Sequence, residues 1–283
     1  MNFMKRILTI QDISCIGRCS LTVALPIISA MGIETAILPT AVLSTHTAFQ
    51  NFTFKDLTDQ ILPIAQHWKS ENMQFDAFYT GYLGTVEQID IVIKAIEMFR
   101  SPDNLLFVDP AMADNGKMYA AFDPSFAKHM ARLCARADII VPNITEAAFM
   151  TDMPFEQTYT AAYIDQLLEK LCCLGAKKVI LTGVSFEENR IGAVGIDTSD
   201  HSRFEYFTDR VDAVYHGTGD LFASVCIGAL TAGKTLPEAV GLAADYTAHT
   251  IKITLQDPNR KFYGVNFEQT IPYLINRLSL PHA

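Results

Sequence analysis

Short apolar runs alternate with segments of helical length along most of the chain, and this alternation predicts the fold. The runs that we expect to form buried strands are residues 6–10, 34–38, 75–80, 105–108, 139–141 and 178–181. Strands that alternate with helices favour a mostly parallel sheet covered by helices on both faces. Residues 191–196 and 204–208 predict an antiparallel pair. Because no linker or repeat interrupts the pattern, we predict one α/β domain over residues 1–283.

The segments between these strands carry helix signals. We predict helices over residues 21–31, 55–71, 163–174, 237–255 and 267–278. Pro26 should kink the first of them, and Gly32 should end it. The polar segment 11–20 then becomes a loop at the carboxyl end of the first strand. Ligands of open α/β sheets bind at such strand ends, so this loop is a candidate site.

The charge of the chain excludes some classes of partner. Its formal net charge is −9, and no cluster of lysine and arginine is present. Binding to nucleic acid or to an anionic membrane would need such a cluster, so neither is expected. The first apolar run is too short for a signal peptide and no run is long enough to span a membrane. We therefore expect a cytoplasmic protein.

The six cysteines show no spacing typical of a metal site or a redox motif. In a cytoplasmic protein such cysteines are reduced, and we expect most of them to be buried. Cys15 and Cys19 are the two that we expect near a functional site, because they lie in the loop after the first strand.

One stretch, residues 216–224, carries the strongest chemical signal. Gly217 and Gly219 form a tight turn that leads directly into an apolar helix. The free N–H groups and the dipole at a helix N-terminus favour an anion, and glycine lets a ligand approach the backbone closely. Asp220 follows in the first helical turn. A carboxylate beside an anion site can deprotonate a hydroxyl that attacks a phosphoryl group.

The residues around this turn resemble the C-terminal signature of the pyridoxal kinases, which belong to the ribokinase-like superfamily. The resemblance lies in residues 211–214 and in the run Gly217-Thr218-Gly219-Asp220. It implies a three-layer α/β/α sandwich with a mostly parallel sheet and an antiparallel edge. It also implies a homodimer that uses Mg²⁺ and ATP to phosphorylate a small hydroxymethyl heterocycle. Asp220 would be the catalytic base, and Gly217, Thr218 and Gly219 would supply the anion hole.

The same resemblance implies substrate contacts at Asp12, Thr47 and Tyr82, together with Asp220. The family has a Gln-Ser pair after its first strand and a Ser-Asn-His-Thr stretch further on, where this chain has Gln11-Asp12 and residues 44–47. The ring of Tyr82 would stack on a flat heteroaromatic substrate. A carboxylate at position 12 in place of a hydroxyl favours a nearby cation, which predicts a preference for pyridoxamine over pyridoxal.

Two acids after the strand at 105–108 point to the nucleotide. Asp109 and Asp114 match the family pattern Asp-Pro-Val-(x)-Gly-Asp, with Ala113 in the position of its glycine. Such acids can hold Mg²⁺ or face phosphates through it, although an Asp-Pro pair is also common in turns. Residues 115–119 resemble the mobile flap that these kinases close over the nucleotide, with Tyr119 as its contact.

A second set of nucleotide contacts follows from the resemblance. Pro142-Asn143-Ile144-Thr145-Glu146 matches a Pro-Asn-x-x-Glu signature in which the asparagine meets phosphate and the glutamate orients water bound to the metal. The predicted metal residues are therefore Asp109, Asp114 and Glu146. The remaining predicted nucleotide contacts are Thr182, Gly183, Arg210 and Val211, in addition to Thr218 and Gly219. A monovalent cation would have only the carbonyl of Val141 at the position where the family often has threonine.

The leading hypothesis is an ATP-dependent kinase that phosphorylates the 5′-hydroxymethyl group of pyridoxal, pyridoxamine or pyridoxine. Two alternatives stay open. One is a hydroxymethylpyrimidine kinase of thiamine synthesis, which shares the fold and the glycine turn. The other is a sensor without catalytic activity that binds a B6 vitamer or a nucleotide. Asp220 argues against a sensor, because binding alone needs no base.

Overall fold

A nine-stranded sheet organises the chain in the computed structural model, which describes residues 4–279. The strand order is β11-β10-β9-β8-β5-β4-β1-β2-β3. The parallel strands are β1 (Arg6–Ser14), β2 (Glu34–Leu43), β4 (Ala77–Thr80), β5 (Leu105–Val108), β8 (Ile139–Ile140) and β9 (Lys178–Val184). The antiparallel strands are β3 (Phe54–Asp56), β10 (Arg190–Asp197) and β11 (Arg203–Asp209). The predicted antiparallel edge is confirmed, and β3 adds one at the opposite end.

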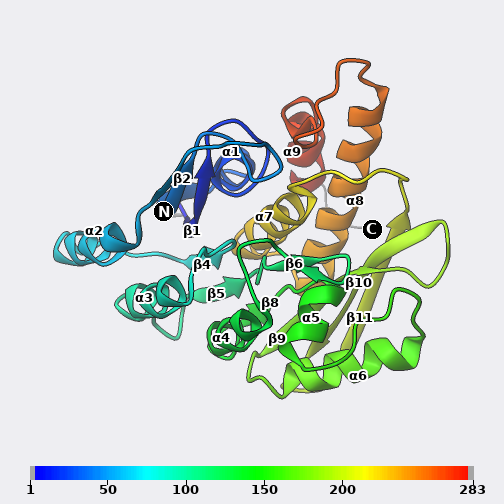
Figure 1. Ribbon diagram of the computed structural model, residues 1–283, viewed down its shortest axis with the longest axis horizontal. Coiled ribbons are helices and arrows are strands. Elements are labelled where there is room, and N and C mark those ends of the chain that lie inside the picture. Colours follow the sequence, from blue (N-terminus) through cyan, green and yellow to red (C-terminus); the bar gives the residue numbers. More distant parts are fainter. Residues whose placement is uncertain (1–3, 280–283) are drawn as a thin grey trace.

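Helices cover both faces of the sheet, as Figure 1 shows. One face packs against α2 (Thr58–Ser70), α3 (Val86–Glu97), α4 (Pro124–Cys134), α5 (Ile144–Met150) and α6 (Ala161–Cys172). The other face packs against α1 (Leu21–Ala30), α7 (Thr218–Thr231), α8 (Leu236–Gln256) and α9 (Ile271–Ser279). Side chains of a strand alternate between faces, so Leu106 and Val108 belong to the first core and Phe107 to the second. The predicted three-layer α/β/α sandwich is confirmed.

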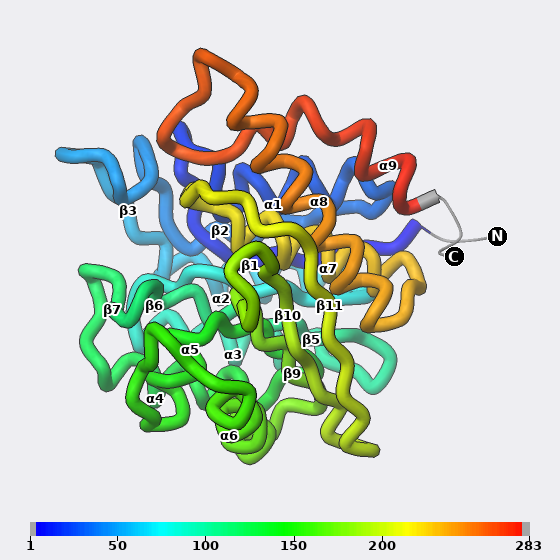
Figure 2. Tube along the Cα trace, turned by 90° about the vertical axis from the view of Figure 1, so that its right-hand side faces the viewer, coloured from blue at the N-terminus to red at the C-terminus, as the bar shows by residue number. Residues whose placement is uncertain are grey.

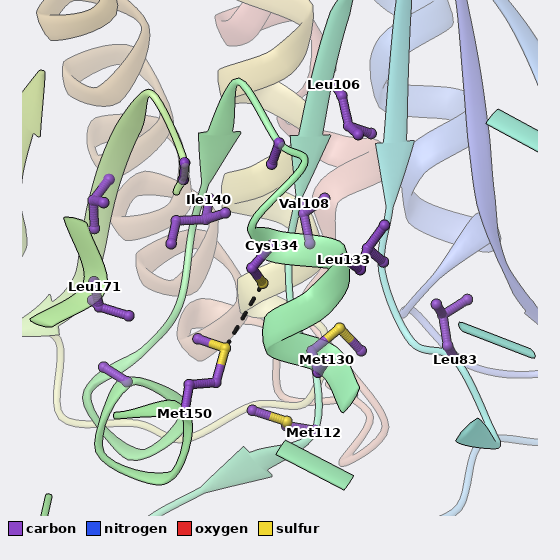
Figure 3. Close-up of a cluster of buried hydrophobic side chains, with 14 of the residues drawn as sticks. Leu83, Leu106, Val108, Met112, Met130, Leu133, Cys134, Ile140, Met150 and Leu171 are labelled. Atoms are coloured by element: carbon purple, nitrogen blue, oxygen red, sulfur yellow. Dashed lines mark hydrogen bonds between the residues drawn. The ribbon is translucent and has the colours of Figure 1, made fainter. Parts of the chain in front are cut away.

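The first core lies directly beneath the strand ends that carry the polar residues. In Figure 3, Val108 of β5 and Ile140 of β8 lie near Met130 and Cys134 of α4. The Cys134 thiol lies 3.7 Å from the sulfur of Met150 on α5. These buried side chains fix the carboxyl ends of β5 and β8 relative to the helices that follow them.

A two-stranded hairpin rises from the loop after β5. Its strands are β6 (Ala113–Asp114) and β7 (Lys117–Met118), and Figure 2 shows it beside α4 and α5. The two residues between them, Asn115 and Gly116, have φ of 50° and 75°. Positive φ at both positions is the mark of a type I′ turn, which Asn-Gly favours. The predicted flap is therefore a regular hairpin.

Several predicted boundaries are wrong. Residues 11–14 continue β1 rather than forming a loop, because their pairing with β2 continues beyond a bulge. The helix predicted over 55–71 begins at Thr58, since residues 54–56 pair with β2 as an edge strand and the Asp56 carboxylate accepts the Thr58 N–H at 2.7 Å. The helix predicted over 267–278 begins as a 3₁₀ turn, Phe267–Gln269, before α9.

Two further sequence predictions concern location and thiols. Among residues 4–279, no helix combines the length and the apolar character that crossing a membrane requires.

All six cysteines are free, but only Cys134 and Cys226 are buried, so the prediction that most would be buried is wrong. Cys15 and Cys173 are exposed because they lie in surface segments beyond the regular elements.

Candidate active site

The carboxyl ends of the parallel strands and the start of α7 bring four acids together. Asp12 lies near the end of β1, Asp109 follows β5, Glu146 lies in α5 after β8, and Asp220 lies in the first turn of α7. Burial, and then the carboxylates of Glu146 and Asp220, raise the pKa of Asp109 well above its ordinary value. These acids therefore lie close enough together, at a single edge of the sheet, to affect one another's pKa.

The turn before α7 contains two glycines, and the space around their Cα atoms differs. Gly217 is the N-cap of α7 with φ of 78°, and a Cβ there would collide with the carbonyl oxygen of Arg18. Gly219 has no other atom within 4 Å of the place its Cβ would take. The fold thus requires the first glycine, whereas the second leaves open space. The N–H groups of the first helical turn have no intrahelical acceptors and are available to an anion in that space.

Asp220 borders this space and is partly buried. Burial raises its pKa to about 7, the backbone N–H of Ser20 opposes the rise, and the Asp12 carboxylate adds to it. A carboxyl group that titrates near neutral pH is suited to accept a proton from an alcohol.

Asp12 and Tyr82 lie together at the same edge of the sheet, near Asp220. Asp12 is 4% exposed, and its Oδ2 accepts the Ser14 hydroxyl at 3.0 Å. Burial and then the Asp12 charge raise the pKa of Tyr82 to about 12, which places the two side chains close together. The predicted contact Thr47 is exposed, and it follows the buried His46. The His46 ring lies 5.1 Å from the ring of His216, so Thr47 adjoins the glycine turn.

Glu146 is buried and connects the loop after β5 to α5. Its Oε1 accepts the Met112 N–H at 3.0 Å and its Oε2 accepts the Asn143 N–H at 2.9 Å. The Asn143 side chain accepts the Glu146 N–H and donates to the Ala113 carbonyl, both at 2.9 Å. Asn143 and Glu146 thus form a capping box at the start of α5. Burial raises the pKa of Glu146 to about 7.

These carboxylates fit a magnesium ion that arrives with a nucleotide. Asp109 is 8% exposed. Within residues 4–279, its carboxylate accepts one hydrogen bond, from the Ala111 N–H to Oδ1. A nearby cation would stabilise such a carboxylate. Within the same residues, no three His, Cys, Asp or Glu side chains gather as a metal site. Mg²⁺ commonly takes one or two carboxylates and completes its shell with phosphate and water oxygens, which agrees with this arrangement.

The hairpin carries two predicted nucleotide contacts. Asp114 is exposed at its tip, where both carboxylate oxygens accept N–H groups of Asn115 at 2.9 Å. Tyr119 lies past its second strand and is 41% exposed. Burial, and then the carboxylates of Glu146 and Asp109, raise the pKa of Tyr119, so its hydroxyl lies near these acids.

The other predicted nucleotide contacts lie farther along this edge. Thr182 of β9 forms a bridge with Asn143, which places those two residues side by side. The Tyr159 hydroxyl donates to the Gly183 carbonyl at 3.4 Å and accepts the Ser185 N–H at 2.8 Å. Arg210 lies near Tyr159, and Val211 follows it. The structure therefore gathers Gly183 and Arg210 around an aromatic ring that sequence reasoning missed.

Two more groups beside the acids were not predicted. Tyr79 is completely buried, and its pKa is raised by burial and then by Asp220 and Asp109. Its only sequence signal is a polar atom at the end of an apolar strand. His46 and His216 pack ring to ring, although 170 positions of sequence separate them, so no local pattern could pair them.

Comparison with known proteins places the chain in a family. The model of the phosphomethylpyrimidine kinase family matches residues 25–265. A protein of Bacteroides thetaiotaomicron, whose proposed activity is that of a phosphomethylpyrimidine kinase, is 37% identical with a TM-score of 0.93 over 99% of this chain and 96% of its own. A second crystal form of that protein, solved with pyridoxal, has a TM-score of 0.91.

Two named pyridoxal kinases are also similar. The crystal structure of the Lactobacillus plantarum enzyme is 29% identical, with a TM-score of 0.88 over 96% of this chain and 97% of that one. Pyridoxal kinase PdxY of Histophilus somni is 28% identical over 289 aligned residues, which cover 95% of this chain and 93% of the relative. The chain thus belongs to the phosphomethylpyrimidine kinase family, its resemblance to the pyridoxal kinases of the ribokinase-like superfamily is confirmed, and it is a kinase.

Proposed function

We propose that this kinase transfers the γ-phosphoryl group of ATP to the 5′-hydroxymethyl group of a vitamin B6 vitamer. The observation that carries the proposal is Asp220, a carboxyl group with a pKa of about 7 in the first turn of α7, next to the open space at Gly219. Support for a B6 substrate comes from the related Bacteroides thetaiotaomicron protein solved with pyridoxal and from the relatives named pyridoxal kinases.

Asp220 is the proposed base for the transfer. It takes the proton of the 5′-hydroxyl as the oxygen forms its bond to the γ-phosphorus, while the bond from that phosphorus to the bridging oxygen breaks and ADP leaves. The N–H groups of Gly217, Thr218 and Gly219 stabilise the charge that develops on the transferred group. A pKa near 7 leaves much of Asp220 ionised at neutral pH, as a base requires.

Asp109 is the proposed magnesium residue of the buried set, and Asp114 approaches from the hairpin. A bound magnesium ion would neutralise negative charge on the phosphate oxygens. Both oxygens of Glu146 already accept backbone N–H groups. We therefore propose that Glu146 orients water bound to the magnesium ion and does not coordinate the ion directly. Asn143, Thr182, Gly183, Arg210, Val211 and Tyr119 are the proposed nucleotide contacts. Asp12, Thr47 and Tyr82 are the proposed contacts of the heterocycle.

Substitution of Asp220 by asparagine tests the base. We expect Asp220→Asn to bind ATP but to lose turnover by on the order of a hundredfold or more, because the amide cannot accept the proton. Asp59→Asn is a matched control, since Asp59 also lies in the first turn of a helix, α2, but on an exposed surface. Nearly unchanged turnover in Asp220→Asn would remove Asp220 from the base role.

The family match favours one second candidate, phosphorylation of hydroxymethylpyrimidine. Coupled ADP production with pyridoxal, pyridoxamine, pyridoxine and hydroxymethylpyrimidine separates the two. The highest kcat/KM should belong to a B6 vitamer, and pyridoxamine should lead if the buried Asp12 attracts its ammonium group. A homodimer, a cytoplasmic location and a monovalent cation at the Val141 carbonyl remain predictions from the resemblance.

A further inference from the structure

Gln88 is a buried polar residue in the first turn of α3, and it has no role in the proposed reaction. Its exposed fraction is 1%. Residues 85–88 have the pattern of a capping box, in which the glutamine side chain would accept the N–H of the N-cap residue. One half of the box is present, since the Thr85 hydroxyl accepts the Gln88 N–H at 3.1 Å. The Gln88 side chain, however, binds segments outside its own helix.

The amide of Gln88 joins three segments of the chain. Its Oε1 accepts the Gly84 N–H at 2.7 Å. Its Nε2 donates to the Thr40 carbonyl at 3.0 Å and to the Thr58 hydroxyl at 2.9 Å. Thr40 belongs to β2, and Thr58 begins α2, which packs beside α3 (Figure 1). Both N–H groups and the oxygen of this buried amide therefore have partners, as a buried polar group requires.

Gly84 connects this amide to Tyr82. The place that a Cβ on Gly84 would take lies 3.7 Å from Gln88 Oε1 and 3.9 Å from Cε1 of the Tyr82 ring. The ring thus rests against the residue whose N–H Gln88 holds. Elsewhere the Tyr82 ring packs on Phe122, with 5.4 Å between the ring centres. The place of the Tyr82 ring therefore depends on the place of Gly84.

The bond to Thr40 relates the Tyr82 loop to the strand that leads toward Thr47. The Thr40 carbonyl also accepts the Leu57 N–H at 3.0 Å, so it is fixed from two sides. β2 ends at Leu43, shortly before Thr47. Gln88 thus sets the distance between the segments that carry two proposed contacts of the heterocycle.

We propose that Gln88 is a positioning residue that holds the ring of Tyr82 in the place where it stacks on the heterocycle. The inference rests on the proposed contact between Tyr82 and the substrate. Gln88 acts through Gly84 and Tyr82 and not on the substrate itself. A well-placed aromatic pair improves binding by up to about tenfold, so loss of the ring's position should cost affinity for the heterocycle and none for ATP.

Gln88→Met tests the inference, because methionine has a similar length and forms none of the three bonds. We expect KM for a B6 vitamer to rise by roughly five- to tenfold with kcat nearly unchanged, since the lost contact acts on the ground state and the transition state alike. KM for ATP should not change. The dissociation constant of pyridoxine, measured by calorimetry without nucleotide, should rise by the same factor.

Thr58→Ala is the matched control. It removes one partner of the same amide and leaves the bond to Gly84 in place. Both variants should lower Tm, because each leaves buried polar groups without a partner. Only Gln88→Met should raise KM for the vitamer and speed the hydrogen exchange of the Gly84 amide, followed by NMR.

Two further variants of Gln88 complete the series. Gln88→Glu keeps an oxygen that can accept the Gly84 N–H, so KM should return toward the wild-type value although Tm stays low. Gln88→Asn replaces Gln88→Met if the latter does not fold. Its shorter amide does not reach Gly84, and the polar space that it leaves can take a water molecule.

A double-mutant cycle with Tyr82→Ala separates positioning from a general loss of structure. If Gln88 acts through the Tyr82 ring, Gln88→Met should raise KM for the vitamer in the wild-type background and hardly further in Tyr82→Ala.

Two outcomes would overturn the inference. One is a KM for the vitamer that is the same in folded Gln88→Met as in the wild type. The other is an equal rise of KM with and without the Tyr82 ring, which would make Gln88 a structural residue only. If the wild-type protein phosphorylates no B6 vitamer, the proposed function fails instead. The same cycle with hydroxymethylpyrimidine then decides the inference, because Tyr82 would stack on either flat ring.

Discussion

The two edges of the central sheet hold carboxylates under opposite conditions. At the amino edge, Asp76 before β4 pairs with Lys5 at 2.9 Å, and Asp138 before β8 pairs with Arg100 at 2.9 Å and Lys177 at 2.7 Å. Burial alone would raise the pKa of each, but the cations and backbone N–H groups hold it below its ordinary value. These acids are satisfied by the protein itself.

At the carboxyl edge the acids have no cation beside them. Within residues 4–279, no salt bridge joins Asp12, Asp109, Glu146 or Asp220 to a cation. Burial raises the pKa of all four. The difference teaches that the same residue type stabilises the fold beside cations at one edge and lies buried without a cation at the other, where the proposed ligands would bind.

Exchange of one acid for its amide at each edge should give opposite results. Asp109→Asn should cut kcat/KM by on the order of a hundredfold and leave the free energy of unfolding unchanged or higher, because it removes an uncompensated buried charge. Asp138→Asn should lower that free energy by about 2 kcal/mol, because Arg100 and Lys177 lose their charged partner, and should leave kcat unchanged. Urea denaturation and coupled ADP assays measure both. A loss of stability in Asp109→Asn with full turnover would break the comparison.

The pH dependence of stability should differ between the edges. Asp220 and Glu146 titrate at about 7 in the folded chain and near 3.8 and 4.5 otherwise. Between these values the folded chain binds more protons than the unfolded chain, so the two acids stabilise it most below about pH 4. That stability is lost as the pH rises through about 7, at up to about 1.4 kcal/mol per unit and per group.

Urea unfolding of the ligand-free protein from pH 5 to 8 checks this dependence. Asp220→Asn should be more stable than the wild type at pH 8 and should approach it toward pH 5. Asp138, whose pKa is lowered, stabilises the fold at every pH above its ordinary pKa, so Asp138→Asn should lower stability evenly from pH 5 to 8 and leave the slope of the profile unchanged. Parallel profiles for the wild type and Asp220→Asn would show that Asp220 does not titrate near 7.

The smallest expected effect on stability concerns Gly219. A Cβ at this position meets nothing within 4 Å, and alanine favours a helix over glycine by up to about 1 kcal/mol. Gly219→Ala should therefore fold with equal or slightly higher Tm. Turnover should fall by roughly tenfold, because the methyl group enters the proposed phosphate space. A thermal melt and an ADP assay decide, and full activity would mean that the phosphates lie elsewhere.

Much of the architecture follows from the sequence because buried parallel strands are distinct apolar runs. Leu105–Val108 and Lys178–Val184 are examples, and the acids expected near one another do meet at one edge of the sheet. The polar end of β1 could not be recognised in this way, because its strand character comes from the pairing of Gln11 and Ser14 with β2, across a bulge at Asp12, and not from its own pattern. The hairpin could have been predicted, since Asn115-Gly116 is a strong signal for a type I′ turn.

Parts of the site have no local signal at all. The buried Tyr79 reads as an ordinary core residue until the fold places it beside Asp109 and Asp220. The same holds for His46 and His216, whose rings lie 5.1 Å apart although they are far apart in the sequence. Such features arise from contacts between distant segments, which a pattern along one chain does not contain.

The attachment of the β6–β7 hairpin determines where it can bend. Its base is bonded to the first turn of α5 through Met112 and Ala113, and its tip is bonded to the same turn by one contact, from the Gly116 N–H to the Thr145 hydroxyl at 3.0 Å. An outward swing of the tip would therefore break this hydrogen bond and the packing of Gly116 against Phe155, while the bonds at the base could stay in place. The helix start that Glu146 and Asn143 stabilise would thus also be the pivot of the hairpin, if it closes over the nucleotide as proposed.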